Sequence, residues 1–142
     1  MHVLTAAIVI FGLLELMNVG VLYLAPGSRK ANGVGVFTAW ERSKADPQVH
    51  QFVRYLVYWV AGTKLIFLGL LAVVLITGTE QTKAATSGVL ALSIGVFFWR
   101  MYPVARQIDS DGNMRPVGYS RTLGVMIAAM VAVFAIGAAL TV

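Results

Sequence analysis

Charged side chains are scarce in this chain, and cysteine is absent. Only 12% of its 142 residues are Asp, Glu, Lys or Arg, whereas 58% are hydrophobic. About a quarter of the residues of a soluble domain are charged, so this chain has too little polar surface to cover a globule in water. The lack of cysteine excludes disulfides, thiol chemistry and iron–sulfur clusters held by thiolates.

Four long apolar stretches make up most of the chain. They lie near residues 2–24, 55–77, 84–102 and 120–142, and each can cross a hydrocarbon layer about 30 Å thick, which takes roughly 20 helical residues. Because backbone amides find no water in lipid, we expect these stretches to be helices. The sequence therefore predicts an all-α, polytopic membrane protein, with residues 1–142 forming a single four-helix transmembrane domain.

The long first loop contains signals of helical structure outside the spans. Val36, Phe37 and Trp40 lie close to basic residues and predict a short interfacial helix. Asp46 followed by Pro47 is typical of a helix start. We therefore expect the second long helix to begin about two turns before its apolar span.

Turn-forming residues also mark the other connections. The turn at 78–82 is short, which predicts that the second and third spans pack as an antiparallel hairpin. Pro103 predicts an end or a kink of the third helix, because proline lacks the N–H that a helix interior needs. Residues 109–113 predict a turn.

Basic residues concentrate on one side of the predicted bundle. Nine lie in or beside the two loops of that side: Arg29, Lys30, Arg42, Lys44, Arg54, Arg100, Arg106, Arg115 and Arg121. The opposite side has Lys83 alone. Since basic loops stay in the cytoplasm, we expect both termini outside and both basic loops in the cytoplasm, in the plasma (inner) membrane.

The same loops predict a binding face. Tyrosine and tryptophan gather at the cytoplasmic ends of the spans, where aromatic rings anchor helices at headgroup depth. This side could in addition hold anionic lipid or a protein partner, and its candidate residues are Trp40, Arg42, Lys44, Arg54 and Arg106. Anionic lipid explains the basic loops more simply than nucleic acid does.

Two charged residues lie inside predicted spans. Glu15 and Lys64 each lie nine residues, or roughly 14 Å, from the cytoplasmic end of an antiparallel helix. An isolated charge at that depth costs several kcal/mol, so the two side chains should pair. Asn18 shares the helical face of Glu15, and Ser93 reaches the same depth from the third span. We therefore predict a polar centre of these four residues, with Arg100 at its mouth.

The role of this centre is open from sequence alone. A buried pair can fix the register of two helices, line a path for a solute or proton, or do acid–base chemistry. No nucleophile–base set, second carboxylate pair or metal-ligand cluster accompanies it. We therefore expect no catalytic residue, no metal and no cofactor.

The fourth span has a face of small residues. Gly124, Ala128, Ala132, Ala135 and Ala139 are spaced by three or four positions. Such a seam lets helix backbones approach closely in lipid. It predicts a packing surface, either within the bundle or between protomers.

These features favour a non-enzymatic accessory or subunit protein. It would bind a larger membrane complex or lipid through its helices and its basic, aromatic face, with membrane lipids and another membrane protein or a second copy as partners. One alternative is a small oligomeric transporter or channel whose path passes Glu15 and Lys64. Another is a lipid-modifying enzyme that uses interfacial polar groups, for which the candidates are Glu41, Asp46, His50, Asp109 and Asp111.

Overall fold

The protein is all-α in a computed structural model that describes residues 2–140, with side chains from Leu4 onward. Its elements are α1 (His2–Leu24), the 3-10 turn η1 (Val34–Val36), α2 (Thr38–Ser43), α3 (Pro47–Thr77), α4 (Glu80–Gly95), α5 (Phe97–Ser110) and α6 (Tyr119–Ala139). Four stretches are long and apolar enough to cross a membrane: Leu4–Leu24, Pro47–Thr77, Glu80–Ser110 and Tyr119–Ala139. The predicted fold class is confirmed, and these spans indicate an integral membrane protein.

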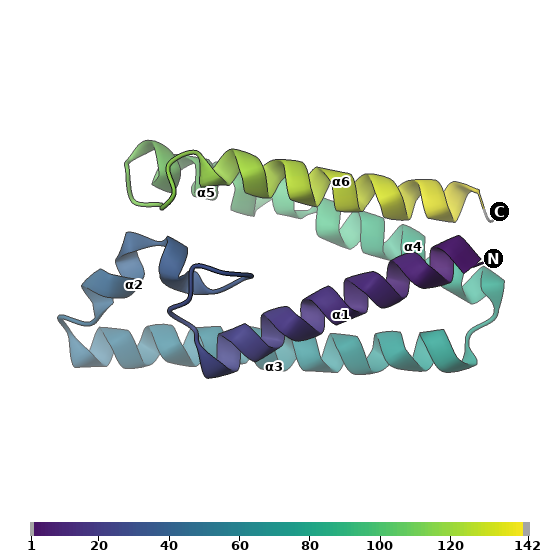
Figure 1. The fold of residues 1–142 in the computed structure, drawn as a ribbon, viewed down its shortest axis with the longest axis horizontal. Coiled ribbons are helices and arrows are strands. Elements are labelled where there is room, and N and C mark those ends of the chain that lie inside the picture. The colour runs from purple at the N-terminus through teal and green to yellow at the C-terminus, as the bar shows by residue number, and fades with distance from the viewer. Residues whose placement is uncertain (1, 141–142) are drawn as a thin grey trace.

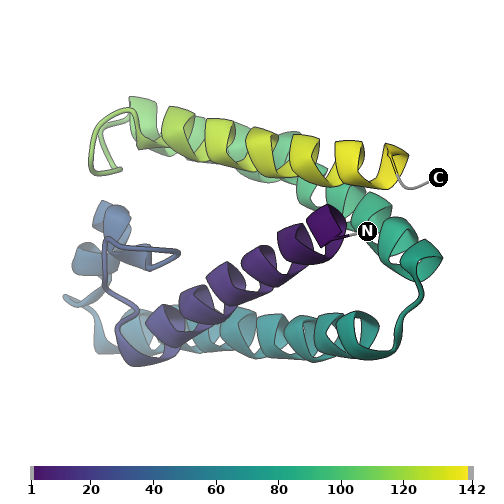
Figure 2. The same ribbon diagram turned by 45° about the vertical axis from the view of Figure 1, so that its right-hand side comes forward.

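The long helices associate in two pairs. Helix α1 packs along α3, and the α4–α5 stretch packs along α6 (Figure 1). Helix α1 also crosses the molecule diagonally, so its first half reaches α4 and α6 (Figure 2). Both described ends of the chain lie at the same end of the bundle as the α3–α4 turn. We call this the terminal end and the opposite one the loop end.

The predicted hairpin of the second and third spans is wrong. Helices α3 and α4 are joined by a short turn at Gly78 and Thr79, but they diverge from it (Figure 1). The first half of α1 packs against α4 and α6 near this turn, and α4 pairs with α6 instead. A short turn fixes where two helices meet and leaves the angle between them free.

Apolar side chains form a core near the terminal end and a smaller cluster near the loop end. The core consists of Leu4, Ile8, Phe11, Leu71, Ala84, Leu90, Ala91 and Phe134. The smaller cluster joins α1 to α3 through Leu22, Val57 and Ala61. The segment of the α1–α3 interface between the two clusters carries the polar residues described below.

Helix α3 begins where the sequence predicts. The Asp46 side chain accepts hydrogen bonds from the backbone N–H groups of Gln48 and Val49, at 2.9 and 3.3 Å, and Pro47 is the first helical residue. These two N–H groups have no partner inside the helix, so the carboxylate satisfies them and caps the helix. This start is confirmed.

The third span is interrupted at Val96 and not at Pro103. Helix α4 ends at Gly95, and α5 continues through Pro103 to Ser110. The N–H of Trp99 bonds the carbonyl of Val96, three residues back, at 3.0 Å, which tightens the chain at the break. Glycine has a low helix propensity, so the weak point falls at Gly95. The predicted helix end at Pro103 is therefore wrong, and the alternative of a kink there stays a prediction.

Helix α5 ends in a glycine motif within the predicted 109–113 turn. Gly112 has a φ of +72°, the left-handed conformation that favours glycine. The N–H of Asn113 bonds the carbonyl of Ile108 at 2.9 Å, and that of Gly112 bonds the carbonyl of Asp109 at 3.0 Å. This pair of bonds is the Schellman arrangement, which satisfies the last carbonyls of a helix.

The two loops of the loop end dock on each other, and we call residues 25–46 and 111–118 the loop layer. Thr38 donates from its backbone N–H to the carbonyl of Asn113 at 3.0 Å and from its hydroxyl to Asn113 Oδ1 at 3.1 Å. The N–H of Arg115 bonds the carbonyl of Val36 at 2.8 Å, and Met114 is fully buried. The loop layer thus has its own hydrogen bonds and its own interior.

Candidate functional site: the ion pair and the loop end

Three polar side chains meet at the α1–α3 interface. Lys64 Nζ bonds Glu15 Oε2, and Asn18 Nδ2 donates to Glu15 Oε1 at 3.2 Å. The side chains of Glu15 and Lys64 are 13% and 25% exposed. Each carboxylate oxygen therefore has one donor, and the pair carries no net charge.

Aromatic contacts between α1 and α3 flank this ion pair on both sides, an arrangement that suits a structural clamp fixing the two helices to each other. Towards the terminal end, the ring of Phe11 meets that of Phe67 edge-on, with 5.9 Å between their centroids. Towards the loop end, Tyr23 stacks on Tyr58 at 5.8 Å. Contacts on both sides hold the two helices in one register, and the pair adds a specific polar contact between them.

The hollow beside Lys64 does not resemble a passage. It is open and shallow, and it is lined by Trp59, Val60, Thr63 and Lys64, which all belong to α3. A solute path past the pair would need walls from several helices. The hollow is therefore not a solute path within a single chain, and an oligomeric path past the pair stays a prediction.

Two predicted members of the polar centre lie elsewhere. Ser93 and Arg100 are both exposed, and among the described residues no hydrogen bond or ion pair joins either of them to Glu15 or Lys64. The buried positions of α4 include Ala84, Ser87 and Ala91, and Ser93 lies on a different face of the helix. Equal depth in the membrane does not bring residues together when their helices turn different faces to each other.

The predicted binding face also changes in one member. Trp40 is buried, and its ring lies 4.8 Å from the imidazole of His50. Arg42, Lys44, Arg54 and Arg106 are exposed as the prediction requires. The face is therefore basic, and its first-loop tryptophan packs inside the loop layer.

The whole net charge of the chain lies in the loop-end half. Glu15 pairs with Lys64, and near the terminal end Glu80 pairs with Lys83 at 3.2 Å. The remaining nine basic and four acidic side chains lie towards the loop end and leave a net charge of +5 there. The potential of the molecule is thus strongly positive at one end.

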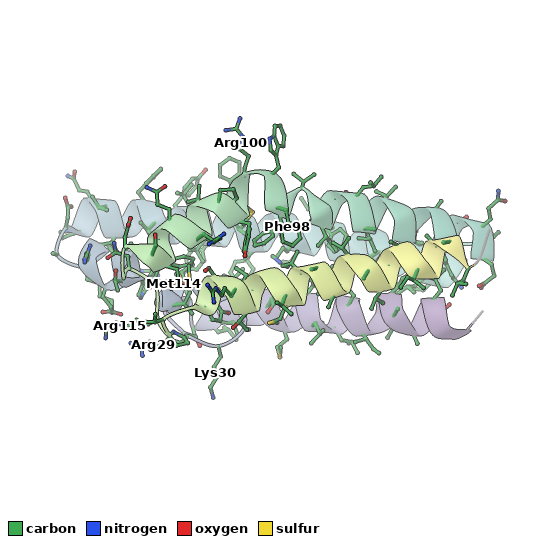
Figure 3. The ribbon with its side chains drawn as sticks, turned by 90° about the horizontal axis from the view of Figure 1, so that it is seen from above. Arg29, Lys30, Phe98, Arg100, Met114 and Arg115 are labelled. Carbon is green, nitrogen blue, oxygen red and sulfur yellow. The ribbon has the colours of Figure 1, made fainter. Side chains whose placement is uncertain are left out.

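Three of these basic residues form a group that sequence spacing could not reveal, and we call it the basic patch: Arg29, Lys30 and Arg115. They extend from the same face of the loop layer (Figure 3). Backbone bonds from Gly35 to Ser28 and from Arg115 to Val36 hold their segments together, at 3.0 and 2.8 Å. Among residues 2–140, no ion pair includes a patch residue.

The candidate residues of a lipid-modifying enzyme are mostly engaged in structural contacts. Glu41 pairs with Lys44 at 2.7 Å, and Asp46 caps α3. The Nδ1 atom of His50 lies 2.8 Å from the Ser43 hydroxyl, which itself donates to the carbonyl of Trp40 at 2.7 Å. Within the described residues, no group of three or more His, Cys, Asp or Glu side chains could hold a metal ion.

Asp109 is a structural residue whose role the sequence did not reveal. It is buried, and it accepts hydrogen bonds from the N–H groups of Gly118 and Ser120, both at 2.9 Å, and from the Ser120 hydroxyl at 2.6 Å. Gly118 has no side chain to cap α6, so a carboxylate from α5 caps it instead. A cap supplied from nine residues away has no local sequence signal.

The small-residue seam of α6 faces outward over most of its length. Gly124 is buried against the ring of Tyr102, whereas Ala128, Ala132, Ala135 and Ala139 are exposed. The part of the seam formed by these four alanines is therefore accessible in the single chain. A seam between chains stays a prediction.

Searches of protein-family models, of curated proteins and of solved structures find no match to this sequence.

Proposed function

We propose that this chain is a non-enzymatic accessory protein of the membrane that binds anionic phospholipid headgroups through its basic patch. The observation that carries this proposal is a folded loop layer whose three patch residues point to one side and form no ion pair with an acidic side chain of the described residues. Lysine and arginine near a membrane surface gain about 1 kcal/mol each from anionic lipid. Three such residues could give a preference that is measurable and that salt weakens.

The orientation follows from the same charges. Nine of the basic residues lie at the loop end and one at the terminal end, so we expect the loop end in the cytoplasm and both termini outside. The cytoplasmic leaflet is the one rich in anionic lipid. A plasma (inner) membrane location fits this arrangement.

Order in the loop layer supports the proposal further. Gly33 and Gly35 pass so close to the backbone of residues 27–28 that a side chain at either position would overlap it. The patch is therefore presented by a packed backbone. A rigid presentation loses less conformational entropy on binding than a flexible loop would.

Lipid preference in detergent micelles tests the proposal. We expect phosphatidylglycerol to raise the Tm of the wild-type protein more than phosphatidylcholine does, and the triple variant R29Q/K30Q/R115Q to lose most of this difference. The variant R42Q/R54Q/R106Q removes the same charge from the sequence-predicted face. An equal loss in both variants would mean that net charge alone matters, and an unchanged preference in the patch variant would overturn the proposal.

A second candidate function is supported by the exposed alanine face of α6. Ala128, Ala132, Ala135 and Ala139 offer close backbone approach to another transmembrane helix, as an accessory subunit requires. The chain has no cysteine, so a single Ala132→Cys variant gives a clean probe. Oxidative cross-linking in native membranes should yield a defined adduct for Ala132→Cys and little for the control Val133→Cys, which is exposed at the same depth on another face of α6. Equal yields from both positions would remove the support.

A further inference from the structure

Arg100 leaves the bundle on the side away from the basic patch (Figure 3). It lies in the first turn of α5 and is exposed, and its guanidinium carbon is 5.2 Å from the centroid of the Trp99 ring. No ion pair of the described residues includes it. Its neighbours Val96, Met101 and Val104 are exposed apolar side chains. A charge thus lies on an otherwise apolar, lipid-facing surface.

The depth of Arg100 follows from its neighbour in the second helix pair. A Cβ atom at Gly124 would lie 2.7 Å from the Tyr102 ring, so this ring is level with Gly124. Gly124 lies five residues into α6, roughly 8 Å from its start, and Arg100 lies about 3 Å deeper. This places the Arg100 backbone roughly 10 Å below the start of α6. An arginine side chain can cover much of that distance by extending towards the headgroups.

A stripe along α5 leads from this depth towards the loop end. Arg100, Val104 and Gln107 follow at intervals of four and three residues, so they share one face of the helix, and all three are exposed. Gln107 lies about 10 Å closer to the loop end than Arg100. The stripe is therefore polar at both ends and apolar between them, with the Trp99 ring beside it.

We propose that this α5 stripe holds one phospholipid of the leaflet at the loop end. The Arg100 guanidinium would donate two hydrogen bonds to the phosphodiester, for which its planar fork is suited. An acyl chain would lie over Trp99 and Val104, and Gln107 would contact the headgroup. The occupant is a lipid and not free phosphate, because exposed apolar side chains surround the cation.

This inference goes beyond the proposed function, because it does not depend on the basic patch or on anionic headgroups. Zwitterionic phospholipids carry the same phosphodiester. The α5 stripe should therefore hold phosphatidylcholine, for which the basic patch has no preference. The two proposals can fail independently of each other.

Native mass spectrometry of the protein with phosphatidylcholine in mild detergent tests the inference. We expect the wild type to retain one tightly held lipid, and Arg100→Gln to lower the fraction of the one-lipid species at least fivefold. Arg100→Lys should retain an intermediate fraction, since a lysine forms one contact where the guanidinium forms two. The matched control Arg121→Gln removes the same charge from α6 and should retain lipid as the wild type does.

Two results would overturn the inference. One is equal retention of phosphatidylcholine by the wild type and Arg100→Gln. The other is a wild-type dimer that Arg100→Gln dissociates while lipid retention stays unchanged, because Arg100 would then bind a second copy of the chain. An unchanged Tm of Arg100→Gln verifies that the variant is folded. The triple variant of the basic patch should retain phosphatidylcholine normally.

Discussion

The two helix pairs of this bundle are held together by different chemistry. Between α1 and α3, the central contact is the ion pair of Glu15 and Lys64. Between the α4–α5 stretch and α6, small residues let the helices approach: Gly124 lies against the Tyr102 ring, and buried Ser87 donates to the carbonyl of Phe134 at 3.0 Å. In lipid, burying an apolar side chain between helices gains no hydrophobic free energy. The two pairs show two ways in which helices can associate under this condition.

Each solution has its own weakness. Lipid tails are as apolar as leucine, so helices in a membrane associate through close packing and polar contacts. A charge pair selects one partner and one register, but removing either member leaves the other as an uncompensated buried charge, which destabilises the fold. A small-residue contact leaves no charge behind when it is lost, but it tolerates no added volume.

Removing one charge of the pair should have the largest effect. Lys64→Met leaves Glu15 with Asn18 as its remaining hydrogen-bond partner in a half-buried site, so we expect a loss of about 3 kcal/mol in the free energy of unfolding. The measurement is unfolding in mixed micelles of detergent and dodecyl sulfate, followed by circular dichroism.

The double variant E15L/K64M tests whether Glu15 and Lys64 stabilise the protein as a coupled pair. It removes both charges and fills the site with apolar side chains of similar size. We expect it to unfold within about 1 kcal/mol of the wild type, because a buried ion pair is often replaced without net loss. If the double variant is as unstable as the sum of the two single variants, then the two side chains do not act as a pair.

A larger side chain at Gly124 should destabilise the contact between the α4–α5 stretch and α6. In Gly124→Ala the new methyl group would lie 2.7 Å from the Tyr102 ring, which is fixed by its neighbours Phe97 and Phe98. Overpacking costs about 1–3 kcal/mol, and alanine returns up to about 1 kcal/mol of helix propensity. We expect a net loss of about 1–2 kcal/mol in the same unfolding assay.

Gly137→Ala is the matched control for this effect. Its methyl group would lie 2.9 Å from Leu4 Cδ1, which is the end of a flexible side chain that can rotate away. We expect the free energy of unfolding to stay within about 0.5 kcal/mol of the wild type or to rise slightly. Equal losses from both substitutions would show that any added methyl group on α6 is harmful, and the special role of Gly124 would fall.

The contrast between the pairs also shows what the sequence could predict. Depth along a helix follows from counting residues, so the four spans, the start of α3 and the equal depth of Glu15 and Lys64 were readable. The rotation of each helix about its own axis could not be read from the sequence. Counting residues placed Ser93 level with Glu15, but Ser93 lies on an exposed face of α4. The face that α4 buries depends on which helices pack against it, and the sequence of the third span does not show which helices these are.

Long-range pairing in the loops was the other part that sequence could not supply. Thr38 and Asn113 are 75 positions apart, and nothing local to either residue marks the contact. The basic residues around Trp40 predict a place at the lipid surface. Trp40 is buried because the two loops form a layer with an interior of their own. Hydrophobic residues in a loop indicate burial, but they do not identify what buries them.

The cap of α6 gives a smaller effect within the second pair. Asp109→Ala removes the acceptor of the Gly118 and Ser120 N–H groups and should lower the free energy of unfolding by about 1–2 kcal/mol. Hydrogen exchange should accelerate at these amides before it does elsewhere in α6. Asp111→Ala, on the exposed turn nearby, is the control. If both variants exchange equally fast at Ser120, the capping role is excluded.

The contact that joins the two pairs at the loop end should give the smallest effect. Thr38→Val keeps the shape and the backbone bonds of Thr38 but removes its hydroxyl bond to Asn113, so we expect a loss of about 1 kcal/mol. Hydrogen exchange should accelerate at Arg115, whose N–H bonds Val36 in the neighbouring register, and should stay unchanged at residues beside Glu15. Exchange that rises equally at both places would mean that the two pairs open as one unit, and the division between them would then have no energetic meaning.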